Sequence, residues 1–169
     1  MSITLTDVSA AVADYIKQNV TVEVSNVTHG TSSVLQPDEE ATFTVTLTNA
    51  TDGVRLINIV YDLSIHPSSA AYFHPFGSVT RPCRSEFDLS KPNLTEDDKP
   101  SRLVVWPING SSLGTLDPGQ VIKFDDFAIH TETLGDATVN CHIYATVDQA
   151  SLFPPDQASS TVKRSFTVQ

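Results

Sequence analysis

Apolar and polar residues alternate over most of the chain, starting near residue 20. In residues 41–47, three threonines separate the apolar residues Ala41, Phe43, Val45 and Leu47. This period of two is typical of a half-buried antiparallel β-strand. Stretches of strand character cover residues 20–24, 41–47, 54–65, 103–108, 121–130, 137–147 and 161–168. About seven strands at this spacing predict an all-β antiparallel sandwich.

The phase of the alternation adds local predictions. In residues 121–130, Ile122 and Phe124 share one phase while Phe127 and Ile129 share the opposite phase. One extra residue near positions 125–126 reconciles them, which predicts a β-bulge there. Residues 57, 59, 61, 63 and 65 are apolar in one phase, so they are expected to face inward together. The Asp-Gly pair at 52–53 predicts a hairpin between the strands on either side of it.

Residues 6–18 are the one segment with helical periodicity. Val8, Ala11, Val12, Tyr15 and Ile16 recur at helical spacing and form one apolar stripe. The stripe has two interpretations: the helix packs on its own sandwich, or it docks on a neighbouring subunit or partner. We expect a helix in residues 1–18 and a sandwich domain in residues 19–169.

A long insertion, residues 66–101, separates the third and fourth predicted strands. It is rich in proline and is either functional or partly ordered by short extra strands. It contains Tyr72, Phe73 and Phe76, followed by Arg81 and Arg84. Aromatic residues and arginine in a loop are typical of binding hot spots. The alternative is that these aromatic residues cover an open end of the sandwich.

Two segments of the chain resemble CARDB-type and related bacterial immunoglobulin-like modules. Residues 35–49, from Leu35-Gln36-Pro37 onward, are similar to the early strands of these modules. Residues 116–147, which begin Leu116-Asp117-Pro118, are similar to the later strands. The resemblance implies an immunoglobulin-like sandwich used in adhesion, as a spacer or in surface assemblies, and it supplies no catalytic residues. The predicted helix and the insertion depart from the pattern.

Composition narrows the classes of partner. The chain has 169 residues, enough for one sandwich domain, and a net charge of -10. A strongly acidic chain is a poor ligand for phosphate backbones, so no nucleic-acid partner is expected. No signal peptide and no membrane span are visible in the sequence. The expected location is therefore the cytoplasm, or export as part of a particle.

Few residues are candidates for catalysis, disulfide formation or metal binding. Cys141 is expected in the core, and a disulfide with Cys83 remains an alternative. The histidines show no metal-binding spacing, although two strands could bring His130 and His142 together around zinc. Acidic clusters at residues 38–40, 96–98 and 125–126 are read as solvated loop charge, with calcium as the alternative. The sequence therefore predicts no catalytic residue, no metal site and no cofactor.

The function expected from the sequence is that of a non-enzymatic structural or protein-interaction module. It would be a subunit or accessory of a larger assembly, such as a phage-like or contractile-injection particle or a surface adhesion assembly. A protein partner or a homo-oligomer is expected. The candidate partner-binding residues are Val8, Val12, Tyr15, Ile16, Tyr72, Phe73, Phe76, Arg81 and Arg84. The alternative is a carbohydrate- or ligand-binding module in which Trp106, Tyr72, Phe73 or Tyr144 stacks on a sugar ring.

Overall fold

The computed structural model describes residues 5–74, 83–86, 99–107, 114–148 and 157–169; at residues 5–9, 83–86, 126, 157 and 158 it describes the backbone alone. These residues form one helix and nine strands. The elements are α1 (Leu5–Asn19), β1 (Val20–Val24), β2 (Glu40–Asn49), β3 (Leu56–His66), β4 (Ala71–Phe73), β5 (Cys83–Glu86), β6 (Arg102–Pro107), β7 (Val121–Thr131), β8 (Gly135–Val147) and β9 (Gln157–Val168). Among the described residues, no helix has the length and apolar character of a membrane span.

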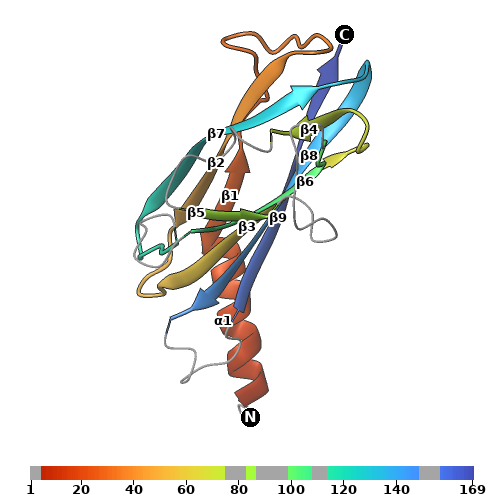
Figure 1. Cartoon of the computed structure of the whole chain (residues 1–169). Coiled ribbons are helices and arrows are strands. Elements are labelled where there is room, and N and C mark those ends of the chain that lie inside the picture. Colours follow the sequence, from red (N-terminus) through yellow and green to blue (C-terminus); the bar gives the residue numbers. More distant parts are fainter. Residues whose placement is uncertain (1–4, 75–82, 87–98, 108–113, 149–156) are drawn as a thin grey trace.

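The strands form two antiparallel sheets that face each other (Figure 1). One sheet has the order β1-β2-β7-β4, and the other has the order β5-β6-β3-β8-β9. Helix α1 projects from one end of the sandwich, and the C-terminus lies at the other end. The predicted all-β sandwich with a short N-terminal helix is therefore confirmed.

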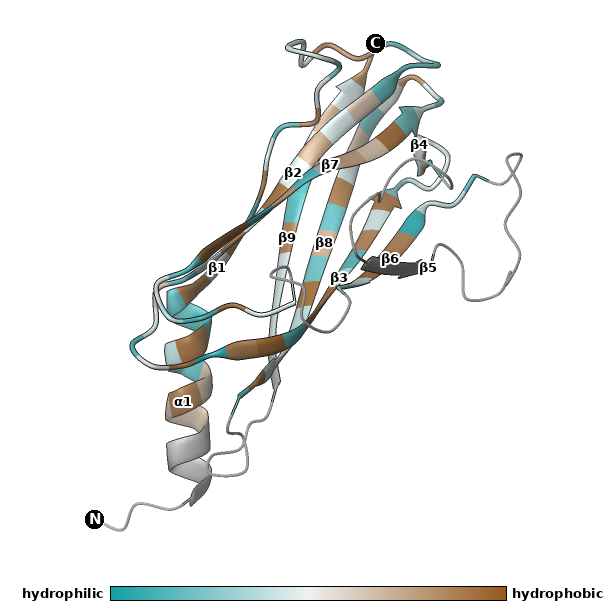
Figure 2. Ribbon diagram, turned by 60° about the vertical axis from the view of Figure 1, so that its left-hand side comes forward, coloured by the Kyte–Doolittle hydropathy of each residue, from teal (hydrophilic) through white to brown (hydrophobic). Residues whose placement is uncertain are grey.

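Strict alternation places one face of each sheet in the core. Along β2, Ala41, Phe43, Val45 and Leu47 are at most 2% exposed, and the threonines between them are half-buried. Figure 2 shows the same alternation of apolar and polar residues along the strands. Aromatic rings fill the space between the sheets: Phe43 stacks on Phe127 with ring centroids 5.3 Å apart. Such pairs add to the stabilisation from buried area.

The predicted bulge in β7 is confirmed by the register of its pairing with β2. Phe43 pairs with Phe127 and Val45 pairs with Phe124, so two steps along β2 match three steps along β7. The extra residue lies at positions 125–126 and allows both phenylalanines to point inward. Asp125 turns outward at the bulge, where its Oδ1 accepts a hydrogen bond from Thr44 Oγ1 (3.1 Å).

A second irregularity, in β3, corrects the predicted phase of that strand. Asn58 has a φ of 52°, and the register with β8 shifts between Ile57 and Val60. As a result Leu56 is buried at 2% exposure, whereas Ile57 is only half-buried. The prediction that Ile57 faces inward is therefore wrong, because asparagine tolerates the left-handed backbone that resets the alternation.

The predicted hairpin at residues 52–53 is also wrong. β2 and β3 belong to different sheets, so the turn between them crosses from one layer to the other. Gly53 still supplies the positive φ (87°) that an Asp-Gly turn favours. A turn signal is local, however, and it does not encode which sheet the next strand joins.

The insertion contributes one edge strand to each sheet. β4 pairs with the end of β7, and β5 pairs with β6. These are short extra strands of the kind that the sequence analysis gave as one alternative for the insertion. The remaining residues of the insertion, 75–82 and 87–98, lie outside the described residues.

The two Leu-x-Pro segments form matching corners at opposite ends of the β2–β7 pair. Leu35 and Leu116 are both fully buried. Three residues later, Asp38 and Gly119 both have a positive φ, 68° and 77°. The amide of Asp38 donates to Thr131 O at the end of β7 (2.9 Å), and the amide of Gly119 donates in the same way to Asn49 O at the end of β2 (2.7 Å).

Candidate functional site

Helix α1 is fastened to the sandwich at its C-terminal end. It continues into β1 without an intervening loop. The amide of Ala50 donates to Asn19 O (2.8 Å), and the amide of Asp52 donates to the hydroxyl oxygen of Tyr15 (2.8 Å). Asn19 Nδ2 also donates to Tyr15 O (2.8 Å), which satisfies a carbonyl in the last turn. The last turn of the helix therefore has a fixed position on the domain.

The rest of the helix is much less covered. Ile16 is buried at 4% exposure and Val12 packs partly against the core, whereas Tyr15 is 38% exposed. Ala10 and Ala11 are exposed, and Figure 1 shows the first turns projecting beyond the sandwich. Ile16 is thus a residue of the domain's own core, which corrects its prediction as a partner-binding residue. The side chain of Val8 lies outside the described part of the chain.

An apolar cavity lies beside the helix, where the helix meets β1, β8 and β9. Its volume is about 200 Å³. Its lining comes from Ala13, Ile16, Lys17, Val20, Val22, Leu47, Leu56, Ile143, Ala145, Ser159 and Ser160. Sequence reasoning missed this cavity; the available signal was Val20 and Val22 of β1, which continue an apolar face next to the helix and stay only half-buried.

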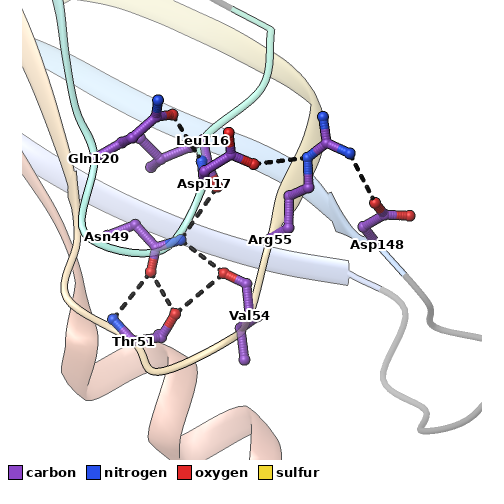
Figure 3. A network of polar contacts seen from close by, with 8 residues as sticks. All are labelled: Asn49, Thr51, Val54, Arg55, Leu116, Asp117, Gln120 and Asp148. Atoms are coloured by element: carbon purple, nitrogen blue, oxygen red, sulfur yellow. Dashed lines mark hydrogen bonds and ion pairs between the residues drawn. The ribbon is translucent and has the colours of Figure 1, made fainter.

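A buried polar network holds the loop on which the helix rests (Figure 3). Asn49 has no exposed surface. Its Nδ2 donates to Val54 O (2.8 Å) and to Leu116 O (3.2 Å), and its Oδ1 accepts from the amide of Thr51 (3.0 Å). One side chain therefore joins the loop after β2 to the Leu116 corner. Buried polar groups satisfied in this way fix the local backbone.

Arg55 adds two ion pairs at the edge of the same corner (Figure 3). Its Nε lies 2.8 Å from Asp117 Oδ1, and its Nη1 lies 3.3 Å from Asp148 Oδ2. The Arg55 side chain is 49% exposed, so these pairs contribute little to stability and act mainly to orient the corner.

The aromatic residues of the insertion divide between core and surface. Phe73 of β4 pairs with Ile129 and has no exposed surface, so it covers the end of the core. Its prediction as a partner-binding or sugar-stacking residue is therefore wrong. Tyr72 points outward and its ring stacks on His130, with centroids 5.0 Å apart. Phe76, Arg81 and the side chain of Arg84 lie outside the described residues.

The two histidines considered as a zinc pair lie on different sheets. His130 is in β7 of the four-stranded sheet, and His142 is in β8 of the five-stranded sheet. Both point away from the core, so the sandwich separates them. The possibility that they share a zinc ion is therefore wrong.

The outer face of the five-stranded sheet carries an exposed tyrosine. Tyr144 is 44% exposed, and its ring stacks on His142 with centroids 4.2 Å apart. Thr161 Oγ1 lies 2.8 Å from His142 Nδ1 and fixes that ring. Nearby, Asp62 accepts hydrogen bonds from Arg102 Nε (3.0 Å) and from Arg102 Nη2 (2.8 Å). These bonds raise the pKa of Arg102.

Cys141 is a buried free thiol. Burial raises its pKa from the ordinary 9.0 to about 12, with a smaller contribution from the charge of Asp62. The thiol is therefore neutral at physiological pH and is a poor nucleophile. Cys83 lies on β5, separated from β8 by β6 and β3, which excludes the alternative of a disulfide between the two cysteines.

Comparisons with known proteins support the fold and no narrower family. No protein-family model matches the chain, and no curated protein matches it in sequence. The resemblance to bacterial immunoglobulin-like modules is therefore supported at the level of the fold, and its CARDB part has no matching family.

Solved structures give the same result. A cohesin module from a family 33 glycoside hydrolase of Clostridium perfringens has a TM-score of 0.54 at 6% identity, over 89% of this chain and 96% of that one. An uncharacterised Nocardia farcinica protein with an immunoglobulin-like fold has a TM-score of 0.44 at 10% identity, over 88% and 96% of the two chains. Domains D2 and D3 of the Corynebacterium diphtheriae pilin SpaD have a TM-score of 0.49 at 11% identity, over 87% and 50%. The chain is an immunoglobulin-like β-sandwich module that is similar in fold to the cohesin module.

Proposed function

We propose that this chain is a non-enzymatic protein-interaction module that joins a larger assembly through α1. The observation that supports this most strongly is the way the helix is held. Its last turn is fastened by the bonds to Ala50 and Asp52, while its earlier turns project from the sandwich. A partner that packs on the projecting turns would bury a surface that the domain itself leaves open.

The energetics of short helices support this proposal. A helix of 15 residues is marginal in water on its own and depends on tertiary packing of an apolar face. Here that packing comes from Ile16 in the second half of the helix and in part from Val12 at its middle. Docking in a groove of a partner would supply the missing packing to the first half.

The cavity beside the helix indicates what kind of group the partner would insert. A volume of about 200 Å³ is smaller than typical small-molecule sites, which start at roughly 300 Å³. It suits one aliphatic or aromatic side chain of a protein. Tyr15, next to it on the helix surface, is a residue type enriched in hot spots.

The likeness in fold is compatible with a role as a module. The similar structure from C. perfringens is itself a module of a larger enzyme chain. The assembly would be a phage-like or contractile-injection particle, or a surface adhesion assembly.

The proposal is tested by two matched substitutions on exposed helix positions, Ala11→Arg and Gln18→Arg. Ala11 lies on the turns that project, whereas Gln18 lies in the fastened last turn and faces solvent. Each variant replaces the natural protein in its source cells, and gentle lysates are separated by size. We expect the natural chain and Gln18→Arg to migrate in a complex and Ala11→Arg to migrate as the 18.3 kDa monomer. A natural chain that migrates as a monomer, or two variants that behave alike, would contradict the proposal.

A second candidate function is carbohydrate binding at Tyr144, favoured by its exposure on the rigid outer face of the five-stranded sheet. One face of the ring is covered by His142, so a sugar would stack on the other face. Binding of soluble oligosaccharides by the natural chain, lost in Tyr144→Ala and kept in Tyr72→Ala, would support it. Absence of binding across an oligosaccharide array would remove it.

A further inference from the structure

Three potential metal ligands, from two separate parts of the chain, meet on the outer face of the four-stranded sheet. One ligand atom from each of Asp38, His130 and Glu132 lies within 4.8 Å of the others. We propose that these three side chains form a binding site for a divalent transition-metal ion of the Zn²⁺ class. The site is separate from the helix and does not depend on the proposed function.

Two of the ligands come from one extended segment. His130 is the penultimate residue of β7, and Glu132 follows the strand directly. Alternate residues of an extended chain point to the same side, so these two side chains face outward together. Thr131, between them, points inward and has no exposed surface. A His-x-Glu pair on a strand is therefore a ready-made pair of neighbouring ligands.

The third ligand is held in place by the backbone of its corner. The amide of Asp38 donates to Thr131 O (2.9 Å), and the amide of Thr131 donates to Glu39 O (2.9 Å). The amide of Glu39 donates to Thr131 Oγ1 (3.1 Å). These bonds fix the Asp38 corner beside His130 and Glu132. A corner whose backbone is fixed before the ion arrives leaves only side-chain freedom to be lost on binding.

The matching corner at the other end of the sheet shows that the fold does not require this carboxylate. Gly119 occupies the equivalent position there with a φ of 77°, against 68° for Asp38. Glycine adopts this conformation without steric cost, and aspartate does so less readily. The same corner is thus formed by a glycine at position 119 and by a residue with a potential metal-binding side chain at position 38.

His130 is oriented for the role. Its ring stacks on Tyr72 at 5.0 Å, and its side chain is only 20% exposed. Its Nε2 lies 4.0 Å from Asp38 Oδ1. Its Nδ1 is buried and has no hydrogen-bond partner within the described part of the chain. The nitrogen that faces Asp38 is therefore Nε2, and the stacking on Tyr72 fixes the plane of the ring beside it.

The cluster already attracts a positive charge. Lys99 Nζ donates to both carboxylate oxygens of Glu132 at 2.7 Å. A metal ion would compete with the ammonium group for Glu132. The exposed, flexible lysine can swing into solvent as the ion enters, so Lys99 should weaken metal binding without blocking it.

The mixed nitrogen and oxygen ligands select the class of ion. Zn²⁺ binds imidazole and carboxylate at about 2.0–2.2 Å, which places its tetrahedral ligands about 3.4 Å apart. Movements of about 1 Å would bring the three groups to that spacing, and the Asp38 side chain is 91% exposed and free to make them. Ca²⁺ prefers six to eight oxygen ligands and should bind poorly here.

The test is calorimetric titration of the metal-free full-length chain with Zn²⁺ and, separately, with Ca²⁺. We expect one Zn²⁺ per chain and much weaker Ca²⁺ binding. Asp38→Gly, which keeps the corner backbone, and His130→Ala should each weaken Zn²⁺ binding by at least about tenfold, the least that loss of a supporting residue usually costs. His66→Ala, at an exposed histidine outside the cluster, should change nothing. Lys99→Met should strengthen binding several-fold.

Other outcomes overturn the site. Equal affinity for Zn²⁺ and Ca²⁺ would show a general acidic surface, as would Zn²⁺ binding that survives both Asp38→Gly and His130→Ala. Absence of binding up to millimolar Zn²⁺ would also exclude the proposal. Thermal unfolding of each variant without metal separates loss of the site from loss of the fold.

Discussion

At the scale of the residue, Asn49 shows how one buried polar group can define a corner. In the sequence, Asn49 continues the inward phase of residues 41–47, next to a turn signal, so the alternation places its side chain inward but does not identify the groups that satisfy its amide. Its importance comes from contacts with Val54 and Leu116, which only folding brings together. Local periodicity records which face a side chain takes, but not which distant carbonyl it meets.

Asn49→Ala should therefore be severely destabilising. The change leaves Val54 O and Leu116 O without this donor and the amide of Thr51 without its acceptor, in a site with no exposed surface. Val54 O keeps the hydrogen bond from Thr51 Oγ1, and Leu116 O keeps the one from the amide of Leu56. We expect a loss of about 2–4 kcal/mol in the free energy of unfolding, because the buried Thr51 amide left unpaired costs about 1–3 kcal/mol and each of the two other lost hydrogen bonds costs about 1 kcal/mol. Chemical denaturation measures it, with exposed Asn26→Ala as the control. A loss below about 1 kcal/mol would contradict the account.

Phe43→Ala tests the core at the same scale. Phe43 is 2% exposed and stacks on Phe127, so its truncation leaves a cavity between the sheets. The expected cost is about 3–5 kcal/mol. Val121→Ala, at a residue that is 60% exposed, should stay within about 0.5 kcal/mol. Similar midpoints for the two variants in urea would show that the core assignment is wrong.

The buried thiol predicts a pH dependence with a defined sign. The pKa of Cys141 is raised from 9.0 to about 12, so the neutral thiol is favoured in the folded state. Its contribution to stability is complete below pH 9 and is lost as the pH rises toward 12. We expect Cys141→Ala to flatten the fall in unfolding free energy over that window.

The burial of Cys141 also predicts slow chemical modification. In a Cys83→Ser background, the Cys141 thiol should react with a disulfide reagent at pH 8 only after unfolding. Fast reaction of the folded protein would contradict its burial.

At the scale of the element, the sequence predicts strands with long alternation and misses those without it. The β7 bulge was readable because Phe124 and Phe127 carry opposite phases on either side of it. β4 and β5 have only three and four residues, too few to show a period. The cluster of Asp38, His130 and Glu132 was readable only in part: His130 and Glu132 alternate along the chain, but Asp38 joins them only through the pairing of a corner with the end of β7.

Helix α1 should divide into a half that stabilises the domain and a half that does not. Ile16→Ala removes a core side chain and should cost about 2–4 kcal/mol. Ala11→Arg, on the exposed side of the helix, should change the free energy of unfolding by less than about 0.5 kcal/mol. Both values come from denaturation of the isolated chain. A large loss for Ala11→Arg would place the whole helix in the sandwich core and leave no free face for a partner.

At the scale of the whole molecule, the two proposed sites lie at opposite ends of the β2–β7 pair. The helix rests on the loop after Asn49, at the end of β2, whereas the metal cluster surrounds the end of β7. Sites that share no contacts are expected to act independently. Asp38→Gly should therefore leave assembly unchanged, and Ala11→Arg should leave Zn²⁺ binding unchanged.

The most direct test of the helix as the attachment point is site-specific photo-crosslinking in the source cells. A photoreactive amino acid replaces Ala11 on the projecting turns or Lys123, an exposed residue of β7, a strand that β2 separates from β1 and the helix. We predict a discrete adduct from position 11, with a second copy of the chain or with one partner protein that mass spectrometry identifies, and no such adduct from position 123. The absence of an adduct at position 11, or the same adducts from both positions, would contradict attachment through α1.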